Sequence, residues 1–276
     1  MCDVGPCGSN PFIYRPHVPL PQVAGVEVDC FADPRDKCIS LRKAPSTSPP
    51  PTCTTVRSPI INEFEPNPMG RNPPTTNFEI RGPPGELFYG EVISIDSDNT
   101  VKHKVGMVSE VGGRFDDYGI LRIVVTGFEN PSHTVVLTEG FLAFPGYNLD
   151  ADGDGIIDSP LMLGSVLDAI GIPNSMADQS VVLGKQIGGI DMNYIGSKAK
   201  LVFRDGCTLA WYAVSSPEND RQVFDQNANV LNNLSDFDVD PREQTFGSAN
   251  PERRTCLLYT SPSPRDQRGS RMPSSA

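Results

Sequence analysis

Short runs of β-branched and aromatic residues recur along most of the chain, and this pattern constrains the fold more than any other feature. Gly, Pro, Asn and Asp separate the runs, which are IINEF (60–64), FEI (78–80), YGEVISI (89–95), GILRIVVTG (119–127), HTVVL (133–137), VLDAI (166–170), KLVF (200–203) and AWYAV (210–214). Short strands between turn residues are typical of a β-sandwich. The stretch LMLGSVLDAI (161–170) could form a single helical turn, and no segment shows helical periodicity over ten or more residues. The sequence therefore predicts an all-β fold.

Alternation inside the run 119–127 predicts which face of that strand is buried. Residues 121, 123 and 125 are all apolar, whereas the opposite face is mixed, with Ile120, Arg122, Val124 and Thr126. Because successive side chains of a strand point to opposite faces, we expect the apolar set to pack inward. We also expect Phe203 and Trp211 to anchor the core, since an aromatic side chain buries on the order of 150–250 Å².

An aspartate-rich stretch, NLDADGDGIID (148–158), is the strongest sign of a binding site. Its spacing matches positions 1, 3, 5, 7 and 9 of an EF-hand-type calcium loop, which here are Asp150, Asp152, Asp154, Ile156 and Asp158. The Ile at position 7 contributes a backbone carbonyl. Position 12 is not Glu, and no helical pattern flanks the stretch. The sequence therefore predicts a Ca²⁺-binding loop on a β protein through these five residues; a solvated acidic turn is the alternative.

Residues 1–58 form a Cys/Pro-rich irregular segment, which we interpret as a linker or the remnant of an upstream module. Five cysteines lie there, at positions 2, 7, 30, 38 and 53, and a sixth is Cys207. Clustering in a segment poor in core residues indicates disulfides formed in an oxidising compartment, with reduced surface thiols as the alternative. Zinc is not indicated, because no C-x-x-C pair or suitably spaced His accompanies the cysteines.

The last residues, 256–276, resemble the translation of a transposase-type sequencing adapter read into its flanking primer site. On this interpretation the natural chain continues differently after Thr255, and the tail takes no part in the fold. A disordered Ser/Pro/Arg tail is the alternative. We therefore expect residues 252–276 to be irregular and the sandwich to occupy 59–251. At the other end, residues 1–10 show no signal peptide, since they lack a basic start and an apolar core.

The charge balance excludes some classes of partner. The net charge is −11, which becomes −13 without the three arginines and one aspartate of the adapter-like tail. A field of that sign repels phosphate backbones, so nucleic acid is not an expected partner. No apolar run reaches the roughly 18 residues of a membrane span, so we expect no membrane insertion of this fragment.

Seven further stretches stand in a fixed order around the aspartate-rich stretch. They are INEFEPNP (61–68), FEIRGPPG (78–85), ENPSHTVVL (129–137), LDAIGIP (167–173), LVFRDG (201–206), WYAV (211–214) and TFGSANP (245–251). By their order and joint presence, residues 59–251 resemble the lamin-tail domain family in its secreted and surface form. The resemblance implies an immunoglobulin-like β-sandwich that serves for interaction or anchoring, often attached to secreted hydrolases or nucleases. The rod heptads of lamins are absent.

Catalytic signals are weak. Glu63 and Glu79 have apolar strand neighbours, where an unpaired carboxylate is costly. We therefore expect each to be paired or hydrogen-bonded, with Arg204 and Asp205 as candidate partners. An acid/base dyad like that of glycosidases is the alternative, but no second catalytic signal accompanies it. The three histidines fall in no nucleophile or zinc motif, and His133 is expected to form a hydrogen bond at a strand end.

These observations predict a non-catalytic, calcium-binding β-sandwich module for adhesion, anchoring or protein interaction in a secreted or surface protein, with an extracellular or cell-surface location. The alternative is an accessory domain of a secreted nuclease or phosphoesterase whose catalytic part lies outside this chain. A third possibility, that the fragment is itself a hydrolase, predicts clustered acids and a histidine in one deep pocket.

Overall fold

The computed structural model describes residues 26–28, 41–43, 53–67, 74–98, 102–128, 132–216 and 220–253. The chain divides into two compact units, Met1–Thr52 and Cys53–Ala276. In the first unit, β1 (Val26–Val28) pairs antiparallel with β2 (Leu41–Lys43). The cysteines at 2, 7, 30 and 38 and the adapter-like tail lie outside the described residues.

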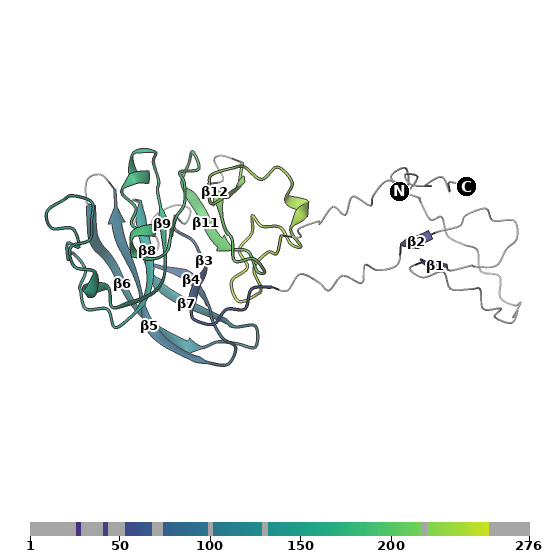
Figure 1. Cartoon of the computed structure of the whole chain (residues 1–276), viewed down its shortest axis with the longest axis horizontal. Coiled ribbons are helices and arrows are strands. Elements are labelled where there is room, and N and C mark those ends of the chain that lie inside the picture. The colour runs from purple at the N-terminus through teal and green to yellow at the C-terminus, as the bar shows by residue number, and fades with distance from the viewer. Residues whose placement is uncertain are drawn as a thin grey trace, which may run out of the picture. The chain divides into compact units, whose positions relative to one another are not determined.

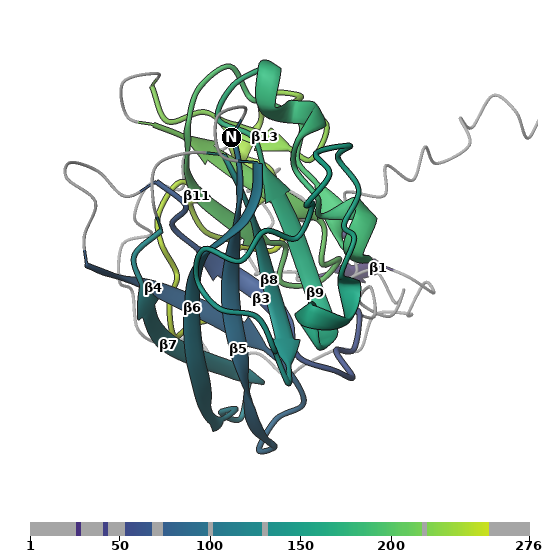
Figure 2. The same ribbon diagram turned by 90° about the vertical axis from the view of Figure 1, so that its left-hand side faces the viewer.

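Two stacked β-sheets form the second unit (Figures 1 and 2). The first sheet has the order β10 (Ile190–Asp191), β9 (Ser165–Ile172), β8 (His133–Glu139), β5 (Leu87–Ser97), β6 (Lys102–Arg114). The second has the order β13 (Val223–Asp225), β12 (Trp211–Ser215), β11 (Ala199–Arg204), β3 (Ile60–Phe64), β4 (Thr75–Arg81), β7 (Ile120–Thr126). Neighbouring strands are antiparallel except β9 and β10. The predicted all-β sandwich is confirmed, and its immunoglobulin-like character stays a prediction.

Each predicted apolar run overlaps a strand, and β3 coincides with its run at both ends. The 13-residue strand β6 was not predicted, because glycines and charges interrupt its apolar residues. Its period of two is nevertheless present: His103, Val105 and Met107 are buried, whereas the residues between them are exposed. In LMLGSVLDAI the single turn is the 3₁₀ helix η1 (Pro160–Leu163), which β9 follows directly.

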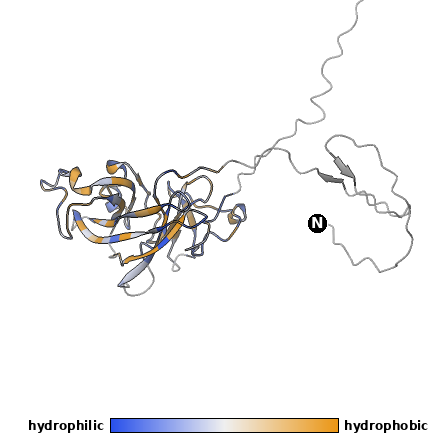
Figure 3. Ribbon diagram, turned by 90° about the horizontal axis from the view of Figure 1, so that it is seen from below, coloured by the Kyte–Doolittle hydropathy of each residue, from blue (hydrophilic) through white to orange (hydrophobic). Residues whose placement is uncertain are grey.

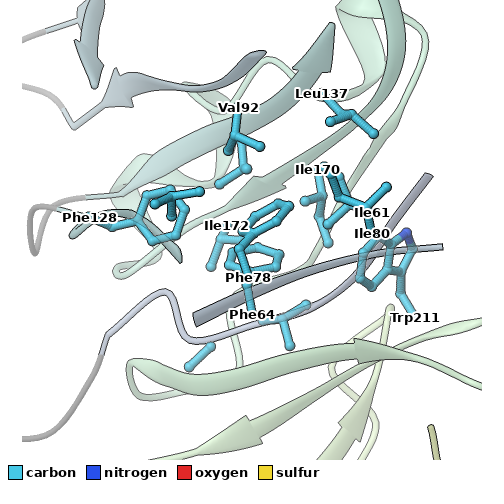
Figure 4. Close-up of a cluster of buried hydrophobic side chains, with 14 of the residues drawn as sticks. Ile61, Phe64, Phe78, Ile80, Val92, Phe128, Leu137, Ile170, Ile172 and Trp211 are labelled. Carbon is cyan, nitrogen blue, oxygen red and sulfur yellow. The ribbon is translucent and has the colours of Figure 1, made fainter. Parts of the chain in front are cut away.

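The main hydrophobic core fills the space between the two sheets. The fully buried rings of Phe64, Phe78 and Phe128 form its centre, with ring centroids 5.3–6.3 Å apart, and Trp211 closes one side (Figure 4). Hydrophobic and hydrophilic residues alternate along the strands (Figure 3). Leu121 and Val125 point into this core, as the alternation predicted. Such interdigitated apolar burial supplies most of the free energy that favours folding.

Two smaller apolar clusters cover the outer faces of the sheets. On the five-stranded sheet, loop residues pack over alternate side chains of β5, β8 and β9. On the six-stranded sheet, Phe203 and Tyr212 pack beneath residues of the C-terminal segment, including Phe237 and Phe246. Phe203 is therefore a core anchor, as predicted, but of this outer cluster. The loops act as additional layers outside the sandwich.

Two further links hold the sandwich together. Arg204 on β11 bonds to both carboxylate oxygens of Asp168 on β9, at 3.0 and 2.9 Å, and so ties the two sheets. A disulfide joins Cys53 to Cys207, across 154 residues of sequence. Part of the N-terminal cysteine cluster thus pairs with the sixth cysteine. Within the described residues, no helix is long and apolar enough to cross a membrane.

Candidate metal site

The aspartate-rich stretch forms a surface loop, residues 150–158, here called the Asp loop. Both of its ends are anchored, because Leu149 and Ile157 are buried in the outer cluster of the five-stranded sheet. The backbone closes the loop through a hydrogen bond of 2.8 Å from Asp158 N to Leu149 O. The side chain of Gln186 also holds the loop, because its Oε1 accepts a hydrogen bond from Ile157 N and its Nε2 donates one to Gly155 O. The loop therefore has a fixed base and an exposed rim.

Local sequence chemistry explains the path of the loop. Asp and Asn side chains tend to accept backbone N–H groups two or three residues ahead, which tightens a turn. Asp150 Oδ1 accepts a hydrogen bond from Gly153 N at 2.8 Å, and Asp154 Oδ1 accepts one from Ile156 N at 2.8 Å. The loop also needs positive φ at Gly153 (76°) and Gly155 (89°), a region that glycine enters without steric cost. The alternating Asp-Gly pattern is thus compatible with this tight coil.

Three of the predicted ligands converge. Carboxylate oxygens of Asp150, Asp152 and Asp158 all lie within 4.8 Å of one another. Two oxygens bound to one calcium ion at about 2.4 Å each lie at most about 4.8 Å apart, so this spacing suits a shared ion. Asp154 does not join the group, and the side chain of Ile156 is 60% exposed. The loop therefore brings three of the four predicted carboxylates together.

A histidine that the sequence did not point to lies beneath the loop. His103 on β6 is buried, with Nδ1 2.6 Å from Asp150 Oδ2 and Nε2 3.0 Å from the carbonyl oxygen of Val181. Burial disfavours the charged form of Asp150, but hydrogen bonds from His103, Gly155 and Gly153 hold its pKa below the ordinary value. This network fixes the orientation of Asp150 while the other two carboxylates stay exposed.

The donor set fits a hard divalent cation. All three converging side chains offer carboxylate oxygen, the ligand type that Ca²⁺ and Mg²⁺ prefer. Asp150 Oδ1 accepts a single hydrogen bond, from Gly153, and so retains a free lone pair. The exposed rim leaves room for the waters that complete the six to eight ligands of calcium. Electrostatic repulsion also favours a bound cation, because three close carboxylates repel each other unless a cation lies between them.

The sequence identified the loop but missed its support. Asp150, Asp152 and Asp158 were recognised by spacing alone, which is a local property. His103 and Gln186 reach the loop from residues 47 and 31 positions away. In the sequence, the period-two alternation of β6 could have indicated that His103 is buried. It could not have indicated that His103 bonds to Asp150. Leu161, at position 12 of the calcium-loop pattern, is 84% exposed and lies in η1.

A second polar cluster is formed by the buried glutamates. Glu63 on β3 and Glu79 on β4 are directly opposite each other, and both are fully buried on the outer face of the six-stranded sheet. They bond to residues 244–250, here called the strap. Thr245 N donates to Glu63 Oε1 at 2.9 Å, and Thr245 Oγ1 lies 2.6 Å from Glu63 Oε2, while Gly247 N donates to Glu79 at 2.6 Å. The expectation that both carboxylates are hydrogen-bonded is confirmed.

The predicted partners of these glutamates were wrong. Arg204 bonds to Asp168 instead, and Asp205 accepts backbone N–H groups from Thr208 and Arg253. Burial raises the pKa of Glu63 to about 7, against the hydrogen bonds from Thr245 that lower it. The two glutamates therefore hold the strap, an arrangement in which the carboxylates are covered by backbone. His133, at the start of β8, stacks on Phe128 with ring centroids 5.2 Å apart.

Comparison of the chain with protein-family models, curated proteins and solved structures found no match. The resemblance to the lamin-tail family therefore stays a prediction that rests on the sequence stretches alone. What the chain does must be inferred from its own geometry.

Proposed function

We propose that this chain is a non-catalytic, calcium-binding β-sandwich module that serves adhesion, anchoring or protein interaction in a secreted or surface protein of the lamin-tail type. The observation that carries the proposal is the convergence of Asp150, Asp152 and Asp158 on one anchored loop. A rigid two-sheet scaffold with an ordered surface loop suits a module that presents a binding surface.

The ion has a limited energetic role in this proposal. Extracellular calcium modules have dissociation constants of about 10⁻⁴–10⁻³ M. With about 1 mM calcium and the tighter value, binding stabilises the folded state by about 1.4 kcal/mol. The sandwich core does not depend on the loop, because the loop packs outside the sheets. Calcium therefore orders the Asp loop and leaves the rest of the fold intact.

The disulfide supports the proposed location. Cys53 and Cys207 join the start of the second unit to the turn after β11. Disulfides persist in oxidising compartments and are rare where thiols are kept reduced. A secreted or cell-surface protein meets that condition and also meets millimolar calcium, so the two features favour the same location.

Calorimetry and thermal melts test the calcium site. We expect heat of calcium binding and a melting temperature about 3–5 °C lower in EDTA than in 1 mM calcium, from the 1.4 kcal/mol above. The variant Asp152→Asn removes one converging charge from the exposed rim and should abolish most of this difference. Asp117→Asn, an equally exposed aspartate in the β6–β7 turn, is the matched control and should behave like the wild type.

The result that contradicts the proposal is equally definite. If EDTA leaves the melt unchanged and calorimetry shows no heat with calcium, the Asp loop is a solvated acidic turn. If Asp117→Asn loses the response as fully as Asp152→Asn, calcium acts through net charge rather than through the loop.

A further inference from the structure

The strap covers the outer face of the six-stranded sheet by two kinds of contact. Phe246 packs against the outer apolar cluster that contains Phe203 and Tyr212. The polar contacts are made by the two buried glutamates, by Glu65, which accepts a hydrogen bond from Gln244 Nε2, and by Asn250, whose side-chain amide donates to Asn62 O at 3.1 Å and Arg204 O at 2.8 Å. The strap thus replaces the solvent that would otherwise reach Glu63 and Glu79.

The hydrogen bonds between the strap and Glu63 leave room for one more proton. The Thr245 hydroxyl lies 2.6 Å from Glu63 Oε2 and 3.2 Å from Asn250 Oδ1, and both of these oxygens are acceptors. A hydroxyl carries one hydrogen and accepts through two lone pairs. It satisfies both neighbours only when Glu63 Oε2 carries a proton, donates it to Thr245 Oγ1, and Thr245 donates to Asn250. A protonated Glu63 therefore completes the chain of bonds.

We propose that Glu63 is protonated while the strap is closed, and that its ionisation as the pH rises loosens the strap from the sheet. The strap is then a proton-dependent cover of this face, independent of the Asp loop. Loosening uncovers the part of the outer apolar cluster against which Phe246 packs.

The charges around Glu63 favour the protonated form. Glu79 faces it across the strand pair and Glu65 lies just after the end of β3, and the negative charges of both raise its pKa. Asp116 and Arg122 act with opposite signs on Glu79, and Lys200 on β11 acts on Glu65. The strap itself, QTFGSAN, carries no charge, and the β11 neighbour of Glu63 is Phe203. The described surroundings therefore give Glu63 no direct cationic partner.

The size of the effect follows from the pKa of Glu63, which is about 7 when the site is closed and 4.5 in water. The closed state binds the proton more tightly, so closure is favoured at low pH and weakens as the pH rises towards 7 and above. Two-state linkage with these values makes strap opening about tenfold more frequent at pH 8 than at pH 6.

Hydrogen–deuterium exchange of the full chain tests the proposal. Peptides that cover residues 244–250 are measured at pH 6 and pH 8, with the intrinsic exchange rate corrected at each pH. We expect about tenfold more opening at pH 8 in the strap, at opening free energies well below those of peptides from β8 (His133–Glu139), which lies in the sheet core. Glu63→Gln keeps the donor and acceptor of the protonated acid, so its strap should stay protected at both pH values. Glu110→Gln, an exposed acid on β6, is the control and should retain the wild-type response.

Three results would overturn the proposal. The first is equal protection of the wild-type strap at both pH values, and this measurement needs no variant. The second is equal opening free energies for the strap and the β8 peptides at both pH values, because unfolding of the whole sandwich rather than strap release would then explain the exchange. The third is a Glu63→Gln protein that keeps the tenfold pH response.

Discussion

Arg204 links the two sheets through a set of buried contacts. Its guanidinium bonds to both oxygens of Asp168, donates to Ile61 O and Leu209 O at 2.9 Å each, and lies 4.1 Å from the centroid of the Trp211 ring. The side chains of the ion pair are only 14% and 9% exposed. The pair thus joins the two sheets at a place that water barely reaches.

We predict that Arg204→Met lowers the free energy of unfolding by about 3–5 kcal/mol, the usual cost of leaving one buried charge without its partner. For a domain of this size, that corresponds to a fall of roughly 6–20 °C in melting temperature. Urea unfolding at pH 7 measures it directly. Arg242→Met removes an ion pair whose side chains are 44% and 43% exposed, and should change stability by at most about 1 kcal/mol.

A second variant separates the charge from the packing. In Arg204→Met with Asp168→Asn, the neutral amide can still accept the bond from Ile61 N, and no buried charge remains. The double variant should therefore be more stable than Arg204→Met alone. A loss of less than about 1 kcal/mol in Arg204→Met, or a double variant less stable than the single one, would contradict this prediction.

Three further outcomes are expected. Replacing Cys53 and Cys207 by Ser should lower the free energy of unfolding by about 2–5 kcal/mol, and an unchanged urea midpoint would contradict this stabilising role. His103→Gln should weaken calcium binding by about 10–100-fold in calorimetry, since the imidazole orients Asp150; equal affinity would exclude that role. Because the pKa of Glu63 rises from 4.5 to about 7 on folding, its contribution to stability is complete below pH 4.5 and is lost as the pH rises through 7. Glu63 should thus make the wild-type protein more stable to urea at pH 5 than at pH 8 by roughly 2–3 kcal/mol, and Glu63→Gln should lack this contribution.

Local patterns in the sequence predicted most of the strands. Period-two alternation marked β7, and the β-branched run IINEF marked β3 with its observed ends. Strand β6 was not predicted because three of its positions are glycine, which adds no apolar side chain to the pattern. Its long pairing with β5 stabilises it through backbone hydrogen bonds and tertiary contacts that no single window shows.

The site was predictable only where its chemistry is local. The spacing of the aspartates is contained in nine residues, so the loop was found. Its buried support, His103, and the strap that holds Glu63 come from distant parts of the chain, 182 residues away in the case of Thr245. Burial indicated that Glu63 needs a partner, but the choice between Arg204 and the strap depends on the path of the chain after β13. Sequence patterns do not contain that path.

The central claim is that Asp150, Asp152 and Asp158 share one calcium ion. A crystal structure grown in calcium, with anomalous diffraction to identify the ion, tests it most directly. We expect a single calcium bound by oxygens of these three carboxylates at about 2.3–2.6 Å, with waters among the remaining ligands. Carboxylates that point apart into solvent, with no anomalous peak between them at saturating calcium, would contradict it.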